Sequence, residues 1–142
     1  METYIHRVQY YETDRMGITH HSNYIRWMEE ARVVFLDSIG WGYDRMEELG
    51  ILSPVVSVEA NYRHTTTFGD RVAIGVWIQE YRGVRLVVSY EMKNTETGEV
   101  VFTGSSSHCF LDRSGGLIRM KKAFPQVDQV LKSMVQRGHE KG

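Results

Sequence analysis

The residues best suited to catalysis lie together between positions 10 and 32. Asp14 falls in a predicted loop, Gly17 follows three positions later and allows a tight turn, and His21 stands where a helix begins. A helix N-terminus presents unpaired N–H groups at the positive end of the helix dipole, which can bind a carbonyl oxygen as negative charge develops on it. A nearby carboxylate can attack the carbonyl or activate water. On spacing alone, a turn or capping role for Asp14 is the favoured interpretation.

The spacing of residues gives little support to phosphate binding, to a serine or cysteine nucleophile, or to a metal site. Neither glycine-rich phosphate-binding motif occurs in the chain, and the segment Gly104–His108 lacks the nucleophile elbow of serine hydrolases. Cys109 needs no role beyond that of a small hydrophobic residue. One group of side chains with metal-binding atoms does not have the spacing of metal ligands: Asp14, His20, His21 and His64. We therefore expect no metal site.

The composition describes an ordinary globular protein. The chain has 142 residues, and its 17 basic against 18 acidic residues exclude a broadly basic surface for nucleic acid. The single cysteine cannot form an internal disulfide, which favours a reducing compartment. No apolar run approaches the roughly 18 residues of a membrane helix, and no secretory signal opens the chain. These features predict one cytoplasmic domain, residues 1–142, that binds neither nucleic acid nor membrane.

The hydrophobic period predicts the elements around the candidate residues. Alternation over Thr3–Tyr11 predicts a strand, followed by a loop over Glu12–His20. A helix is predicted over His21–Ser38, capped by Ser22 or Asn23 and ended by Gly40. Its apolar stripe comprises Tyr24, Trp27, Met28, Ala31, Phe35 and Ile39, with Val34 beside them. Its polar face comprises Arg26, Glu29, Glu30, Arg32 and Asp37.

The rest of the chain alternates between short turns and strands. A short helix over Tyr43–Leu49 precedes four predicted strands, around 52–66, 72–78, 86–92 and 100–111. A C-terminal helix over about 123–136 and a frayed tail over 137–142 complete the chain. Short connections imply antiparallel pairing, and the order of elements predicts an α+β fold with a long helix on one sheet face. The other face or an edge would need a partner, so a homodimer is expected.

The stretch from 10 to 32 also resembles a known family. The matching residues are Tyr11, Glu12, Thr13, Asp14, Gly17, His21, Asn23, Tyr24 and Trp27, followed by Glu30-Ala31-Arg32. This pattern resembles the hotdog-fold acyl-CoA thioesterases of the 4-hydroxybenzoyl-CoA thioesterase type. The resemblance covers about residues 3–125 and includes Tyr62-Arg63 and Phe68-Gly69-Asp70. It implies the hotdog fold, in which an antiparallel sheet wraps a long central helix.

The resemblance also implies a reaction and roles for single residues. The reaction is hydrolysis of a CoA thioester to free acid and CoA, with no cofactor beyond the CoA of the substrate. Asp14 corresponds to the catalytic aspartate, acting as nucleophile or general base, and the His21 N–H to the group that polarises the carbonyl. Gly17 shapes the loop. Tyr24 and Trp27 fall near the acyl pocket, although a core role fits them equally.

The family's active sites lie between two protomers, so the resemblance supports the homodimer, and we expect dimers to pair into a homotetramer. The sequence leaves open whether they do. Candidate partners for the CoA phosphates are Arg63, His64, Arg82, Arg119, Lys121 and Lys122.

Two departures from the family pattern, at Met16 and at Thr19-His20, leave the acyl group undefined. An acyl-carrier-protein thioester stays open as the substrate. Two other functions also stay open. One is an acyl-thioester hydratase or dehydratase that uses His21 with Asp14, and the other is a non-catalytic acyl-CoA binding module.

Overall fold

The computed structural model describes the backbone of residues 2–141 and the side chains of residues 3–135. In chain order the elements are β1 (Glu2–Arg7), the 3₁₀ turn η1 (Tyr10–Glu12), α1 (Ser22–Ser38), α2 (Tyr43–Glu48), β2 (Val55–Tyr62), β3 (Arg71–Tyr81), β4 (Arg85–Asn94), β5 (Val100–Cys109), α3 (Met120–Ala123) and α4 (Pro125–Lys141). The last helix therefore continues past its predicted end, through residues 137–141 of the expected tail, and Gly142 lies outside the described residues. No helix in the described part of the chain is long and apolar enough to cross a membrane.

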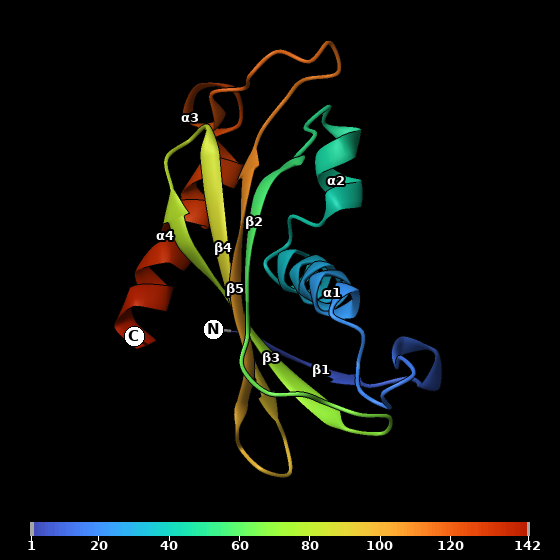
Figure 1. The fold of residues 1–142 in the computed structure, drawn as a ribbon. Helices are drawn as coiled ribbons and strands as arrows, with labels where there is room; N and C mark the ends of the chain where they lie inside the picture. Colours follow the sequence, from blue (N-terminus) through green and yellow to red (C-terminus); the bar gives the residue numbers. More distant parts are fainter. Residues whose placement is uncertain (1, 142) are drawn as a thin grey trace.

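The strands form one antiparallel sheet in the order β1-β3-β4-β5-β2. Helix α1 lies against one face and α4 against the other (Figure 1), so the predicted α+β fold is confirmed. The second face, which we expected a partner to cover, is partly covered by α4: the Tyr81 hydroxyl of β3 donates to Asp128 of α4 over 2.6 Å.

One connection in the sheet determines where the site can form. β2 does not pair with β3, the next strand in the chain, but with β5 at the edge of the sheet. Residues 63–70 must therefore cross from the edge to the far side. On the way they meet the loop before α1: the Thr19 N–H donates to the Thr66 carbonyl over 2.8 Å, and the Thr67 hydroxyl to the Gly17 carbonyl over 2.7 Å.

The apolar stripe of α1 is confirmed with two exceptions. The buried side chains are Tyr24, Trp27, Met28, Ala31, Phe35 and Leu36, together with the polar Asn23 and Arg32. Val34 of the expected stripe is 46% exposed, whereas Arg32 of the expected polar face is only 6% exposed. The helix ends as predicted, with Gly40 at a φ of +86°, in the left-handed region that glycine tolerates.

Arg32 can be buried because hydroxyl groups from three other elements accept hydrogen bonds from its guanidinium. Its Nε donates to the Tyr43 hydroxyl over 2.7 Å, and its Nη1 donates to the Tyr90 hydroxyl over 3.0 Å. Tyr90 in turn bonds Ser106 over 2.7 Å, and Ser106 bonds Nε2 of His108 over 2.8 Å. These contacts offset the cost of burying the guanidinium and tie α1 to α2, β4 and β5.

Two local predictions near the N-terminus of α1 are wrong. The first strand ends at Arg7 rather than Tyr11, because the Glu12 side chain folds back to accept the Gln9 N–H over 2.8 Å and closes a 3₁₀ turn. The N-cap of α1 is His21, which makes no side-chain capping bond. Asn23, a predicted cap, instead donates its Nδ2 to the Glu12 carbonyl over 2.9 Å.

We expect His108 to make stability depend on pH. Burial and the neighbouring Arg32 cation lower the pKa of His108 from 6.5 to about 4. Between these values the unfolded chain binds a proton that the folded chain does not, so His108 destabilises the fold as the pH falls through this window. Urea unfolding across the window should show a flatter pH dependence in His108→Gln than in the parent. Equal slopes would contradict this assignment.

Candidate active site

The loop that carries Asp14 is a tight, internally bonded turn. The Asp14 N–H donates to the Ile18 carbonyl over 2.8 Å, and the Gly17 N–H donates to the Asp14 carbonyl over 3.0 Å. Gly17 has a φ of +80°, which explains the glycine at this position. An isolated bridge between Thr13 and Thr19 closes the loop.

The Asp14 carboxylate is half-buried and accepts a single hydrogen bond from the described residues. Its Oδ1 accepts the Met16 N–H over 2.8 Å, which sets the orientation of the carboxylate. Among residues 3–135, no side chain forms an ion pair with it and no donor reaches Oδ2. One oxygen is therefore held in place while the other is available for chemistry.

The start of α1 offers a free donor beside this loop. The Asn23 N–H bonds the His20 carbonyl over 3.0 Å, and the Tyr24 N–H bonds the His21 carbonyl over 3.3 Å. The His21 N–H has no acceptor among the described residues. It lies at the positive end of a helix that runs over Ser22–Ser38, the setting in which an N–H binds a carbonyl oxygen or an anion.

A cavity of about 220 Å³ opens where the loop and the start of α1 meet the chain after β2. It is lined by Ile18, Thr19, His21, Tyr24, Tyr62, Arg63, His64 and Thr65. Sequence reasoning named His21, Tyr24, Arg63 and His64 as site residues, and the structure brings these four together. Tyr62 was missed as a site residue, although the resemblance included it; its hydroxyl donates to the His21 carbonyl over 3.2 Å.

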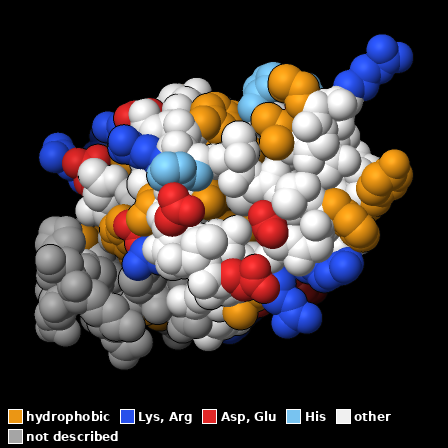
Figure 2. All heavy atoms as spheres, turned by 60° about the horizontal axis from the view of Figure 1, so that its bottom comes forward, with side chains coloured by type: hydrophobic (Ala, Val, Ile, Leu, Met, Phe, Trp, Pro, Cys, Tyr) orange, Lys and Arg blue, Asp and Glu red, His pale blue; other side chains and the backbone are white. Residues whose placement is uncertain are grey.

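The surface around the loop is unusually apolar for an exposed turn. Tyr10, Tyr11 and Met16 are each more than three-quarters exposed, and Phe68 is about half exposed. Figure 2, which brings this end of the molecule forward, shows hydrophobic side chains at the surface next to histidine. The surface around the loop therefore exposes several large apolar side chains to solvent.

Next to the cavity, three buried hydroxyl groups form a chain of hydrogen bonds. The Tyr24 hydroxyl bonds Thr66 Oγ1 over 2.9 Å, and Thr66 bonds Thr19 Oγ1 over 2.6 Å. Burial raises the pKa of Tyr24 despite these hydrogen bonds, which keeps the phenol neutral. The Tyr24 ring stacks on Phe102 with centroids 5.3 Å apart. Tyr24 therefore belongs both to the cavity and to the core.

Trp27 does not line the cavity. Its side chain is fully buried, and its indole Nε1 donates to Glu12 Oε2 over 2.7 Å. Trp27 therefore takes the core role that the sequence had left open, and it does not contact this cavity.

The candidate phosphate partners lie in several separate regions. Arg63 and His64 lie at the cavity; Arg63 has a long contact of 3.4 Å to Thr103, and His64 pairs with Glu99 over 3.3 Å. Arg119 and Lys122 line a different cavity of about 630 Å³ beside α3. Neither Arg119 nor Lys122 lines the cavity at His21. Lys121 lines a further cavity beside the start of α4.

Arg82 also lies apart from the cavity and pairs with Glu80 over 3.0 Å. In the part of the chain that the structure describes, no group of three or more His, Cys, Asp or Glu side chains could hold a metal ion.

Comparison with known proteins identifies the family. The model of the thioesterase-like superfamily matches residues 8–134. The chain belongs to this superfamily. It is 39% identical over 119 residues to the "Putative acyl-CoA thioesterase YneP" of Bacillus subtilis (strain 168), covering 83% of this chain and 86% of that protein. It is 26% identical over 95 residues to the 4-hydroxybenzoyl-CoA thioesterase of Pseudomonas sp. (strain CBS-3), covering 65% and 67%.

A solved structure supports the same assignment. The DHNA-CoA thioesterase of Staphylococcus aureus superposes with a TM-score of 0.90 at 30% identity, covering 99% of this chain and 94% of that one. The resemblance and the hotdog fold predicted from the sequence are thus confirmed, and the superfamily member described here is a thioester hydrolase.

We expect Thr66→Val to weaken the folded state, because it removes the hydroxyl that Tyr24 and Thr19 share. Loss of such a buried partner typically costs about 1–3 kcal/mol in the free energy of unfolding. The matched control, Thr65→Val, changes an exposed neighbour with the same substitution, and should stay within about 0.5 kcal/mol. Urea denaturation measures both, and equal effects would contradict a structural role for the Thr66 hydroxyl.

Proposed function

We propose that this thioesterase hydrolyses an acyl-CoA to the free acid and CoA, with Asp14 as the reacting carboxylate. Two observations carry the proposal: among the described residues, the Asp14 carboxylate in the loop before α1 accepts a single hydrogen bond, and the His21 N–H at the start of α1 has no acceptor. The cavity that His21 lines, together with Ile18 and Thr19 of the same loop, gives the acyl-thioester group a place to bind. The relatives named as acyl-CoA and DHNA-CoA thioesterases support the class of substrate.

The roles follow from charge. As the thioester carbonyl is attacked, negative charge develops on its oxygen, and the His21 N–H at the positive end of α1 stabilises it. Asp14 acts in one of two ways. As a nucleophile it forms a mixed anhydride with the acyl group and releases CoA thiolate, and water then cleaves the anhydride. As a general base it takes a proton from the water that attacks the carbonyl, and the CoA thiolate leaves.

Arg63 is our candidate for holding a CoA phosphate. It lines the cavity, and among the described residues its guanidinium has one partner, a long contact to the neutral Thr103. A guanidinium in this position can form a bidentate pair with a phosphate. His64 is already paired with Glu99 and is the weaker candidate.

We also propose that two chains associate through β2. Within the described part of the chain this strand pairs with β5 alone, and its valines Val55, Val56 and Val58 are 47%, 65% and 44% exposed. Such an edge favours pairing with another strand. In a two-fold antiparallel pair, the partner's strand would start beside the Tyr62 end of β2, where the cavity opens. Association of dimers into tetramers and a cytoplasmic location stay predictions.

Asp14→Asn tests the catalytic role. We expect kcat for thiol release from acyl-CoA to fall on the order of a hundredfold or more, because an amide neither attacks nor accepts a proton. A panel of aromatic and aliphatic acyl-CoAs, together with acyl-carrier-protein thioesters, identifies the substrate. Asp44→Asn is the matched control, since that carboxylate also accepts one backbone N–H, over 2.9 Å, but lies in α2.

The same assay separates the rival functions. An enoyl product without free thiol would identify a hydratase or dehydratase. Tight acyl-CoA binding without thiol release would identify a binding module. If Asp14→Asn folds and hydrolyses acyl-CoA as fast as the parent, the proposed mechanism is wrong.

Val56→Glu tests the proposed interface. A charge on the β2 edge should halve the mass measured by light scattering after size exclusion, and it should lower kcat/KM because each cavity loses its neighbouring chain. Ile5→Glu places the same charge on a residue that is 57% exposed on β1, the opposite edge, and should change neither. An unchanged mass for Val56→Glu would rule out pairing through β2.

A further inference from the structure

Glu12 is a buried acid that the proposed reaction does not use. It lies two residues before Asp14 and is only 4% exposed. A carboxylate at this depth is costly unless its oxygens are bonded to donors. Its partners therefore show what it holds.

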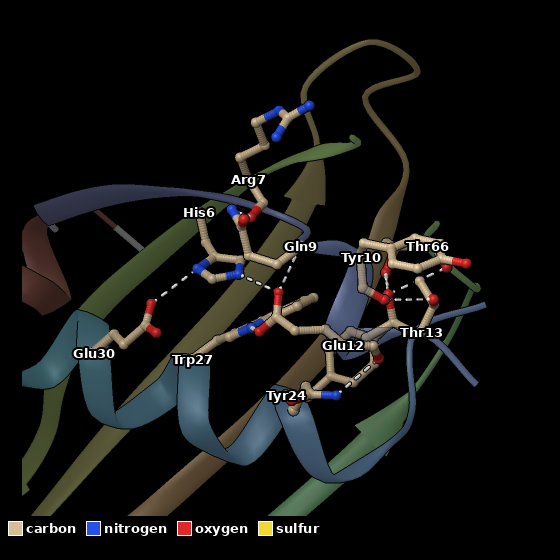
Figure 3. Close-up of polar contacts among 12 residues, drawn as sticks. His6, Arg7, Gln9, Tyr10, Glu12, Thr13, Tyr24, Trp27, Glu30 and Thr66 are labelled. Atoms are coloured by element: carbon tan, nitrogen blue, oxygen red, sulfur yellow. Dashed lines mark hydrogen bonds and ion pairs between the residues drawn. The ribbon is translucent and has the colours of Figure 1, made fainter. Parts of the chain in front are cut away.

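The side chain of Glu12 connects three parts of the fold. Oε1 accepts Nε2–H of His6 in β1 and the Gln9 N–H of the turn, both over 2.8 Å, and Oε2 accepts the indole N–H of Trp27 in α1 over 2.7 Å (Figure 3). All three donors lie outside the cavity. The carboxylate thus binds the strand before the loop to the helix after it.

The backbone of Glu12 closes the base of the same loop. Its carbonyl accepts the His20 N–H over 2.8 Å and Nδ2 of Asn23 over 2.9 Å. His20 directly precedes His21, whose N–H is the proposed carbonyl-binding group. One residue therefore contacts both ends of the loop that carries Asp14.

His6 lies between two carboxylates. Its Nδ1 meets Glu30 Oε2 over 2.9 Å while Nε2 meets Glu12, and its ring packs on Trp27 with centroids 4.6 Å apart. Tyr4 donates to the same Glu30 oxygen over 3.1 Å. Both ring nitrogens of His6 therefore have carboxylate partners, one from the turn before the Asp14 loop and one from α1.

Glu12 stays ionised in this setting. Burial by itself raises the pKa of Glu12, but the hydrogen bonds from Gln9, His6 and Trp27, with the attraction of His6, outweigh it and lower the pKa below its ordinary value. An ionised carboxylate makes stronger hydrogen bonds than a neutral one, which suits a rigid support.

We propose that Glu12 is a positioning residue that sets the approach of Asp14 and the His21 N–H to the thioester. This inference rests on the proposed function. Through His6 and Trp27 it fixes the chain on both sides of the loop, so that the carboxylate and the carbonyl-binding N–H keep one relative placement. Small displacements of reacting groups reduce rates steeply, so the effect should fall on kcat rather than on binding.

Glu12→Gln is the test, with Asp128→Asn as its matched control. Asp128 is also a buried carboxylate, 3% exposed, bonded to Tyr81 and Lys132, but it holds α4 on the other face of the sheet. Both variants remove a buried charge and should lower stability. Only Glu12→Gln should lower kcat, by about tenfold to a hundredfold, with KM changed by less than about twofold.

A second measurement is independent of turnover. The Met16 and Gly17 amides donate to Asp14, and the Trp27 indole N–H donates to Glu12, so their NMR resonances report the geometry of the loop. We expect all three to shift in Glu12→Gln and none in Asp128→Asn. If the parent cleaves no acyl thioester, the proposed function fails, while these resonances still test the positioning.

Three results would overturn the inference: unchanged Met16 and Gly17 resonances in Glu12→Gln, an unchanged kcat in a cleaving enzyme, or an equal loss of kcat in Asp128→Asn. If Glu12→Gln does not fold, Trp27→Phe replaces it, because that change removes one donor to Glu12 and keeps an aromatic ring in the core. A smaller fall in kcat with the same amide shifts is then expected, and no shift would overturn the inference.

Discussion

The need to satisfy one buried carboxylate organises the working end of this molecule. Glu12 is sheltered from water, so its oxygens must find donors, and these come from β1, from the turn before the loop and from α1. The bonds that stabilise the ion also fix where the first strand stops and how α1 is oriented against it. The loop with Asp14 connects the turn at Glu12 to α1, so the site is built on elements that are held rigidly.

The order of strands imposes the second constraint. Because β2 lies at the edge beside β5, residues 63–70 return across the molecule and pass the loop before α1. This return brings Tyr62, Arg63 and Thr66 to the start of α1 and creates the cavity. It also leaves β2 without a neighbour on one side, so the same topology that forms the cavity provides an edge for a second chain.

Polar residues show the limit of pattern-based prediction in this fold. The spacing of apolar residues located α1 and the strands closely, because one face of each must be buried. The same reasoning placed Arg32 on the outer face and extended the first strand to Tyr11. Each error involves a polar contact that hydrophobic spacing does not reveal: Arg32 with Tyr90, and the Glu12 side chain with the Gln9 N–H.

The sequence by itself determined the α+β elements, the tight turn at Gly17 and the placement of Asp14 just before a helix N-terminus. These features depend on the period of hydrophobic residues and on short-range backbone geometry, which neighbouring residues encode. Only the tertiary structure decided which polar groups are buried together, which distant segment completes the cavity and which edge stays open. Those outcomes depend on pairing between segments far apart in the chain, where a charge can be buried only if its partners arrive at the same place.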